Sequence, residues 1–114
     1  MLARRSQDVR TYRGRWAAIS GYLEGHDPRQ QAEQEIQEET GLSSDQVQFI
    51  QSGKPLTIDD KPHFWTVYPF RYQLDRGVTV DLDREHTEFQ WIAPGDWQKL
   101  NTVPKLYETW ERVK

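Results

Sequence analysis

The sequence predicts a single α+β domain in which helices pack on a mixed β-sheet. Three observations predict this class: a helix at residues 28–40 has clear start and stop signals, a two-residue period follows it, and helical spacing returns at the end. A chain of 114 residues corresponds to one domain, and no repeat, linker or low-complexity tract divides it. We therefore expect residues 1–114 to form one folding unit.

The composition excludes several classes of protein and site. The 15 Lys and Arg against 18 Asp and Glu give a formal charge of −3, whereas nonspecific nucleic-acid binders carry a basic stripe. The absence of cysteine excludes disulfides, thiolate zinc sites and a cysteine nucleophile. No apolar run approaches the ~18 residues that span a bilayer, and no signal peptide opens the sequence. We expect a cytoplasmic protein with neither a membrane nor a nucleic-acid partner.

The segment before the predicted helix contains two short strands. Residues 2–5 are expected to end a strand, and the polar residues 6–14 are expected to form a loop. Residues 16–19 are a short apolar run that Ser20 and Gly21 stop, as in a buried strand.

The predicted helix at 28–40 has the clearest punctuation in the chain. Asp27 is a good N-cap, and Pro28 suits the first helical position. Gln30 completes an Asp-x-x-Gln capping box, and Gly41 is the expected C-terminal stop.

After this helix the sequence shows the pattern of strands. Apolar residues alternate with polar ones at 47–49, and aromatic and β-branched residues dominate 64–74. Pro69 cannot donate to a ladder, so it predicts an edge or a bulge within that run. Residues 75–77 are interpreted as a hairpin turn that leads into a strand at 78–80.

The C-terminal third is predicted to contain one more strand and a helix. The strand carries Phe89, Trp91 and Ile92. We expect Trp65, Trp91 and Trp110 in the core because each lies in a periodic apolar context. The stripe that predicts the helix consists of Val103, Leu106, Tyr107, Trp110 and Val113.

A cluster of carboxylates on the predicted helix is the first candidate for chemistry. At 100° per residue, Glu35, Glu38 and Glu39 fall within an arc of about 100°, beside Ala32 and Ile36. Like charges at these spacings repel, so a partly buried cluster needs raised pKa values or a cation. Mg²⁺ prefers such oxygen ligands, together with substrate phosphates. An acidic helix face is more often solvated surface, and the residues alone leave both interpretations open.

The loop before the helix is the second candidate. Residues 20–25 include Gly21 and Gly25 between a short strand and a capped helix, and glycine lets the backbone approach a ligand closely.

Taken together, residues 20–42 resemble the Nudix box. The box has a Gly, five residues, a Glu, seven residues, Arg-Glu, an aliphatic residue, any residue, Glu-Glu, any residue, Gly and an aliphatic residue. The residues in register are Glu35, Ile36, Glu38, Glu39, Gly41 and Leu42.

Three positions depart from the box. Ser20 stands at the first Gly, His26 at the first Glu and Gln34 at the Arg. None of these changes removes a carboxylate from the last turns of the helix. In the family the first Glu and the Arg support each other, so we expect a hydrogen bond between His26 and Gln34 in place of that ion pair. Reduced activity is the alternative that these departures leave open.

The resemblance covers nearly the whole chain. Residues 2–6 look like the family's second strand, whose basic residues often reach substrate phosphate, and residues 12–16 look like the lead into the box. Residues 83–91 resemble the Glu-His…Trp segment of many Nudix hydrolases, in which a loop Glu assists the metal or the water; that position is Glu85. The three histidines are too scattered for a zinc triad, and His86 is expected to be structural or to lie beside the substrate.

The resemblance implies a Nudix-type α/β/α sandwich with a mixed β-sheet. The likeness is greatest to Nudix domains that are fused to initiation-factor-2B-like domains in halophilic archaea. Family members usually carry a strand before residues 2–6, and this sequence begins too late to hold it. A strand at Leu2 without that predecessor would have an open edge, so we expect a homodimer.

The implied activity is Mg²⁺- or Mn²⁺-dependent hydrolysis of a diphosphate bond in a nucleoside diphosphate linked to another group. The expected metal ligands are Glu35, Glu38 and Glu39, and the expected catalytic residues are Glu38, Glu39 and Glu85, with Glu39 or Glu85 acting on the water. The expected substrate contacts are Arg4, Arg5, Arg15, Ser20 and Gly21. The alternative is a Nudix-fold module that binds a nucleotide but hydrolyses it poorly.

Overall fold

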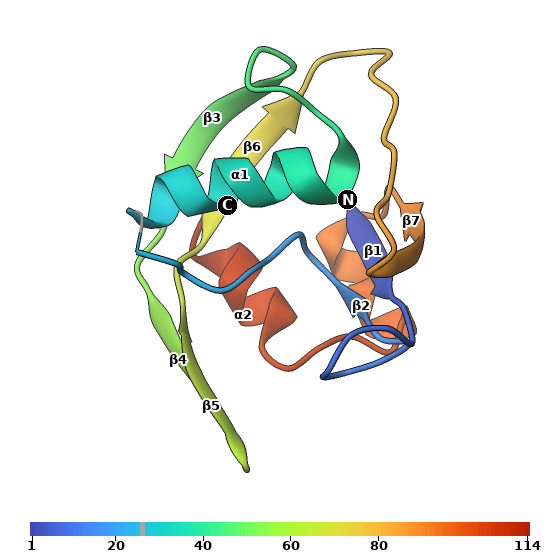
Figure 1. The fold of residues 1–114 in the computed structure, drawn as a ribbon. Helices are drawn as coiled ribbons and strands as arrows, with labels where there is room; N and C mark the ends of the chain where they lie inside the picture. Colours follow the sequence, from blue (N-terminus) through green and yellow to red (C-terminus); the bar gives the residue numbers. More distant parts are fainter. Residues whose placement is uncertain (26) are drawn as a thin grey trace.

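A computed structural model describes residues 1–25 and 27–114. Figure 1 shows a fold built of both helices and strands, and this content confirms the α+β class. The elements are β1 Leu2–Arg5, β2 Trp16–Ala17, α1 Pro28–Thr40, β3 Val47–Ser52, β4 Leu56–Asp60, β5 His63–Val67, β6 Phe70–Leu74, β7 His86–Gln90, the 3₁₀ helix η1 Pro94–Lys99 and α2 Leu106–Glu111.

The strands form three separate groups in the described part of the chain. One sheet has the order β2-β1-β7, and two ribbons pair β3 with β6 and β4 with β5. These pairings are all antiparallel, and the mixed character that we expected comes from one parallel bridge, between Trp16 and Thr102. The β4–β5 hairpin extends away from the rest of the molecule (Figure 1).

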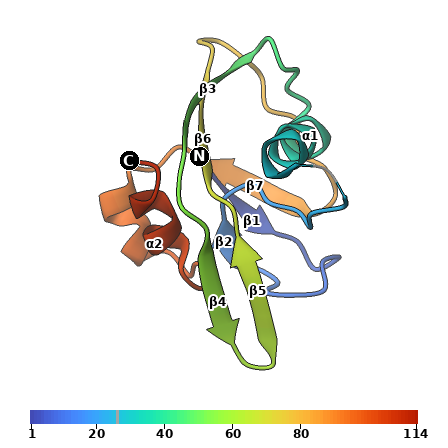
Figure 2. The same cartoon turned by 90° about the vertical axis from the view of Figure 1, so that its left-hand side faces the viewer.

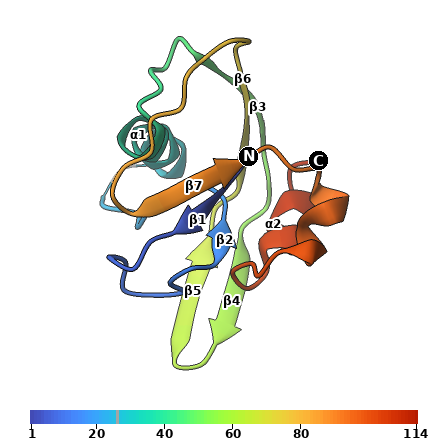
Figure 3. The same ribbon diagram turned by 90° about the vertical axis from the view of Figure 1, so that its right-hand side faces the viewer.

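Two helical layers enclose the β3–β6 ribbon. Figures 2 and 3 show α1 on one side of this ribbon and α2 on the other. On the α1 side, the Tyr72 hydroxyl donates to Glu33 at 2.6 Å, and the guanidinium of Arg29 lies 3.7 Å from the centre of the Phe49 ring. On the α2 side, Arg71 lies over the ring of Trp110 at 5.0 Å. Tyr72 and Arg71 point to opposite layers because side chains alternate along a strand.

The core lies between the β2-β1-β7 sheet and the C-terminal segment. Its fully packed members are Leu2, Trp16 and Leu106. The partly buried side chains around them are Ala18, Ile92, Trp97, Leu100 and Val103. Leu2 and Trp16 anchor β1 and β2 in this cluster. The loop that follows β2 contacts α1.

Helix α1 begins and ends at the predicted residues. The Asp27 side chain accepts a hydrogen bond from the backbone N–H of Arg29 at 3.0 Å, and Pro28 is the first helical residue. Gly41 has a φ of 73°, a left-handed conformation that glycine adopts without strain, and its N–H donates to the carbonyl of Gln37.

The predicted strand at 78–80 is wrong. A turn does occur at Arg76–Gly77, but the backbone that follows runs along the end of α1 rather than along β6. The N–H of Asp81 donates to the carbonyl of Thr40 at 2.8 Å, and the N–H of Asp83 donates to that of Glu39 at 3.3 Å. These carbonyls have no partner within the helix, so they take the hydrogen bonds that a strand would have made.

The expectations for the aromatic strands also need correction. The run at 64–74 divides at Tyr68 and Pro69 into β5 and β6, and β4 was not predicted because it carries only two buried apolar residues. Strand β7 ends at Gln90, so Trp91 lies beyond the strand and is 63% exposed, contrary to the core position that we expected. Trp65 and Trp110 are half-buried.

Strand β1 does not have the open edge on which the homodimer prediction depended. It pairs with β2 on one side and β7 on the other. Among the described strands, β7 pairs with β1 on one side and with no strand on the other. The edge of this sheet that could support association is therefore that of β7 and not that of β1. Among the described helices, none is long and apolar enough to cross a membrane.

Candidate active site

A polar stripe runs along one face of α1. Gln31, Glu35 and Glu39 are four residues apart, which places them on the same side of a helix. The Gln31 side chain is buried, its amide donates to Glu35 Oε1 at 2.8 Å, and its oxygen accepts from the N–H of Glu24 at 3.3 Å. Gln31 therefore ties the loop before the helix to the carboxylate of Glu35. Gln31 is not among the predicted site residues, although its four-residue spacing from Glu35 was a usable signal.

The same loop approaches Glu35 at Gly21. A Cβ on Gly21 would lie 2.1 Å from both the carboxyl carbon and Oε1 of Glu35, so glycine alone fits this position with the side chain where it is. Ser20 is exposed beside it. Of the two predicted loop contacts, the structure brings Gly21 against the acidic stripe.

Glu39 is the buried end of the stripe. Its side chain is 3% exposed, and Oε2 has no hydrogen-bond partner. Burial, followed by the adjacent Glu35 carboxyl and the negative charges of Asp83 and Glu85, raises the pKa of Glu39 to about 10. A buried oxygen without a partner is costly in a folded protein, so it marks a place where a ligand would be stabilising.

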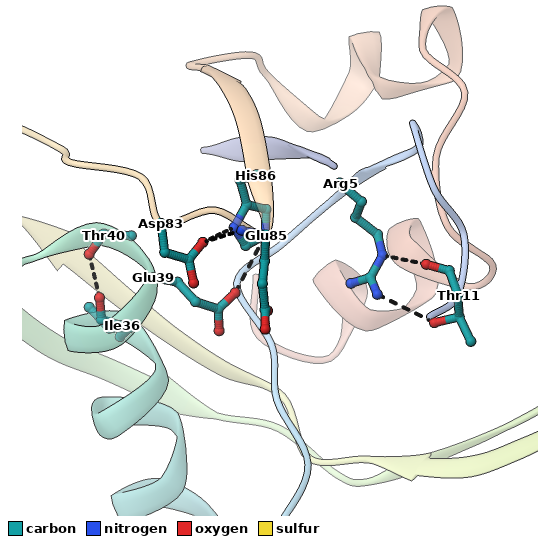
Figure 4. A network of polar contacts seen from close by, with 8 residues as sticks. All are labelled: Arg5, Thr11, Ile36, Glu39, Thr40, Asp83, Glu85 and His86. Carbon is teal, nitrogen blue, oxygen red and sulfur yellow. Dashed lines mark hydrogen bonds and ion pairs between the residues drawn. The ribbon is translucent and has the colours of Figure 1, made fainter. Parts of the chain in front are cut away.

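The turn that begins β7 brings a second group of side chains to Glu39. His86 Nε2 lies 3.4 Å from Glu39 Oε1, and His86 Nδ1 lies 2.9 Å from Asp83 Oδ1. The same Asp83 oxygen accepts the N–H of Glu85 at 3.1 Å, which fixes the turn. Figure 4 shows Asp83, His86 and Glu85 gathered around Glu39, with Glu85 at the exposed edge. Glu85 therefore lies close enough to Glu39 for its charge to act on that carboxyl, and its role in the site stays a prediction.

Glu38 lies on the solvent side of the stripe. It is exposed, and its Oε1 accepts a hydrogen bond from Gln34 at 2.9 Å. Gln34 stands where the sequence pattern has an arginine. The hydrogen bond expected in place of the family's ion pair is one with His26, whereas the bond that the structure describes is with Glu38. His26, the other departure at a charged position of the pattern, lies outside the described residues.

The three candidate arginines make contacts of their own near the loop at 6–15. Arg4 donates to the carbonyl of Gly14 at 3.1 Å and lies 3.7 Å from Glu88, and Arg15 lies 5.2 Å from the centre of the Tyr12 ring. Arg5 donates to Thr11, as Figure 4 shows. Among the described residues, these contacts direct none of the three arginines to a carboxylate of the stripe.

The donor set fits a hard divalent cation without forming a complete site. Among the residues that the structure describes, no three His, Asp or Glu side chains are already arranged to hold a metal ion. The unpaired Oε2 of Glu39, the neighbouring Glu35 and the nearby Glu85 nevertheless supply carboxylate oxygens, which Mg²⁺ and Mn²⁺ prefer. Two cavities, of about 240 and 310 Å³, lie elsewhere, one beside Trp97 and the other beside Trp91.

Comparisons with known proteins identify the family and agree with the fold. The family model of the NUDIX domain matches residues 1–112. An Ap4A hydrolase from C. elegans, solved as a binary complex, has 20% sequence identity and a TM-score of 0.80 over 97% of this chain and 80% of its own. RenU, a Nudix hydrolase from M. smegmatis, has 19% identity and a TM-score of 0.79 over 97% of this chain and 70% of its own. No curated protein sequence matches the chain.

Proposed function

The chain belongs to the NUDIX domain family and is a Nudix-type pyrophosphohydrolase, and from this premise we propose that it hydrolyses a diphosphate bond in a nucleoside diphosphate linked to another group, with Mg²⁺ or Mn²⁺ as its cofactor.

One observation carries the proposed metal dependence. The Glu39 carboxylate is buried with one oxygen unpaired, and three further acids, Glu35, Asp83 and Glu85, surround it. Such a group is stable either when Glu39 holds a proton or when a cation neutralises the charge. Glu39 and Glu35 would hold a divalent cation, whose charge would take the place of that proton.

We assign Glu35, Glu38 and Glu39 as the metal ligands. Glu39 is buried, Glu35 is half-buried and accepts from Gln31, and Glu38 is exposed and accepts from Gln34. A bound divalent cation polarises phosphoryl oxygens and lowers the pKa of a coordinated water.

Glu85 is the proposed residue that acts on the attacking water, in preference to Glu39. It is exposed on the turn beside the stripe, whereas Glu39 Oε1 is already in contact with His86. The water oxygen forms a bond to one phosphorus, and one proton of the water passes to the Glu85 carboxylate. The bond from that phosphorus to the bridging oxygen breaks, and the bridging oxygen leaves as a phosphate oxygen of the other product.

Arg5 and Arg15 are the proposed contacts for phosphate, with Arg4 at the outer edge. The guanidinium of Arg5 uses Nε and Nη2 for Thr11, and Arg15 stacks on Tyr12, so both are held in place without an ion pair. A positioned guanidinium is a strong donor to a phosphate oxygen. Ser20 and Gly21 line the approach along the loop.

The test is a panel of diphosphate compounds with Mg²⁺ or Mn²⁺. It includes dinucleoside polyphosphates, because the C. elegans neighbour is an Ap4A hydrolase, together with nucleotide sugars, ADP-ribose and oxidised nucleotides. We expect metal-dependent release of phosphate-bearing products from at least one class, and loss of that release in Glu39→Gln. Nucleotide binding without hydrolysis by the wild type would instead identify a binding module.

A further inference from the structure

The contacts of Glu39 leave its two oxygens in different situations. Oε1 faces the imidazole of His86, whereas Oε2 has no partner. A carboxylate can rotate about its terminal bond, and such terminal torsions are broad. Something must therefore select which oxygen stays free, and the imidazole is the group in position to do so.

The second ring nitrogen of His86 is held by Asp83. His86 Nδ1 lies 2.9 Å from Asp83 Oδ1, the His86 side chain is 2% exposed, and the ring can only turn by breaking that contact. The hydrogen bond at Nδ1 also fixes Nε2 as the ring atom that meets Glu39.

Asp83 in turn is anchored to the helix that carries Glu39. Its backbone N–H donates to the carbonyl of Glu39 at 3.3 Å, and Asp81 donates to that of Thr40 at 2.8 Å. The chain of contacts thus begins and ends on α1. Movement of the turn relative to the helix would break backbone and side-chain contacts together.

We infer that Asp83 and His86 are positioning residues that hold the Glu39 carboxylate with Oε1 against the imidazole and Oε2 free for a divalent cation. This inference rests on the proposed function, since it assumes that Glu39 is a metal ligand. It assigns no contact with substrate to either residue. Residues that hydrogen-bond to a metal ligand orient it, and their removal typically weakens metal affinity or activity by about 10–100-fold.

A purely structural role is the competing explanation. On that view the Asp83–His86 contact only packs the turn against α1, and its loss would lower stability without affecting metal affinity in particular. Two substitutions of His86 separate the explanations. The amide of His86→Gln reaches the position of Nε2 and can still contact Glu39, whereas that of His86→Asn reaches the position of Nδ1 and keeps only Asp83.

The experiment measures Mn²⁺ binding by calorimetry in the absence of nucleotide, and thermal unfolding in the absence of metal. The proteins are the wild type, His86→Gln, His86→Asn, Asp83→Asn and Glu39→Gln. His63→Gln is the matched control, because His63 lies on β5 against Tyr12 and far along the chain from the stripe. We expect the dissociation constant for Mn²⁺ to rise about 10–100-fold in His86→Asn and less in His86→Gln, with an intermediate rise in Asp83→Asn.

The outcomes distinguish the inference from the proposed function. Wild-type Mn²⁺ affinity in both His86→Asn and Asp83→Asn, with weakened binding in Glu39→Gln, overturns the positioning role and leaves the metal site intact. Equal loss in His86→Gln and His86→Asn, matched by equal loss of stability, also overturns it. Unchanged binding in Glu39→Gln, or no binding by the wild type, removes the proposed metal site and the inference with it.

Discussion

The backbone of Gly21 lies against the carboxylate of Glu35, so closely that one methyl group on Gly21 would occupy the space of the carboxyl carbon. The loop before α1 and the acidic stripe on α1 are therefore fitted to each other. Gln31 reinforces the fit, because its side chain contacts both Glu35 and the backbone of Glu24.

Substitution of Gly21 with alanine should displace Glu35 rather than unfold the protein. The atoms that a Cβ would meet are at the end of a flexible side chain, so Glu35 can rotate away at a cost of about 1 kcal/mol. We expect weaker Mn²⁺ binding with a small change in the free energy of unfolding. Gly95→Ala is the control, because a Cβ there meets no atom within 4 Å. Equal metal affinity in the two variants would show that the loop does not position Glu35.

Metal-free stability should fall as the pH rises. The pKa of Glu39 is about 10 in the folded protein against an ordinary value of 4.5, first because of burial and then because of Glu35. Between these values the folded state holds one more proton than the unfolded state, so the stabilisation is complete below pH 4.5 and is lost as the pH rises toward 10. Urea unfolding in EDTA should show a larger loss from pH 6 to pH 9 in the wild type than in Glu39→Gln. Parallel profiles would mean that Glu39 is not the titrating group.

Mg²⁺ should stabilise the folded protein. A ligand that binds only the native state at 100 times its dissociation constant adds about 2.7 kcal/mol, which is on the order of 10 °C in melting temperature for a domain of this size. The increase should be larger at pH 8 than at pH 6, because Mg²⁺ must displace the proton on Glu39. A melting temperature that does not change on addition of Mg²⁺ at either pH, with and without nucleotide, would count against the proposed metal site.

The three site glutamates, Glu38, Glu39 and Glu85, should divide into two kinds. Glu38→Gln and Glu39→Gln keep the size of the side chain but remove the charge that attracts a hard cation, so both should bind Mn²⁺ more weakly. Glu85→Gln should bind Mn²⁺ nearly as well as the wild type and turn over about 10²–10⁴-fold more slowly, because it acts on the water. Glu108→Gln, on the surface of α2, is the control. Wild-type hydrolysis in all three site variants would place the chemistry elsewhere.

A hydrogen bond between Tyr12 and the β4–β5 hairpin should stabilise the loop at residues 6–15, which carries Arg15. The hydroxyl of Tyr12 donates to Asp60 on the β4–β5 hairpin, and its ring lies 5.6 Å from that of His63 and 5.9 Å from that of Trp65. Tyr12→Phe keeps the ring contacts and should lower the free energy of unfolding by about 0.5–1.5 kcal/mol, and Tyr12→Ala by more. Chemical denaturation measures both, and Tyr107→Phe is the exposed control.

Local signals explain the parts of the fold that were predicted correctly. Asp27, Pro28 and Gly41 each act within one turn of the helix they delimit, so the bounds of α1 follow from neighbouring residues alone. The prediction of a strand at residues 78–80 was wrong for the opposite reason. Its composition suits a strand, but its hydrogen bonds go to the end of α1, a partner that only the folded chain provides.

The candidate site shows the same division. Glu35 and Glu39 could be placed on one face from the helical period, and the loop carrying Gly21 from its position before the helix. The contact of Glu39 with His86 could not, because it joins residues that are distant in the sequence. The burial that raises the pKa of Glu39 depends on that same contact region and therefore on the whole fold.

The pairing of β1 with β7 sets the order in which the molecule can assemble. Arg5 and His86 are register partners about 80 positions apart, and closing a chain segment of that length is an entropic cost that local contacts do not offset. Helix α1 and the β4–β5 hairpin rest on short-range contacts and can form early. During synthesis, a ribosome-bound chain that has not yet reached β7 carries the full acidic stripe but neither the imidazole for Glu39 nor a second partner for β1. Assembly of the acidic centre is therefore a late event in folding, coupled to closure of the sheet.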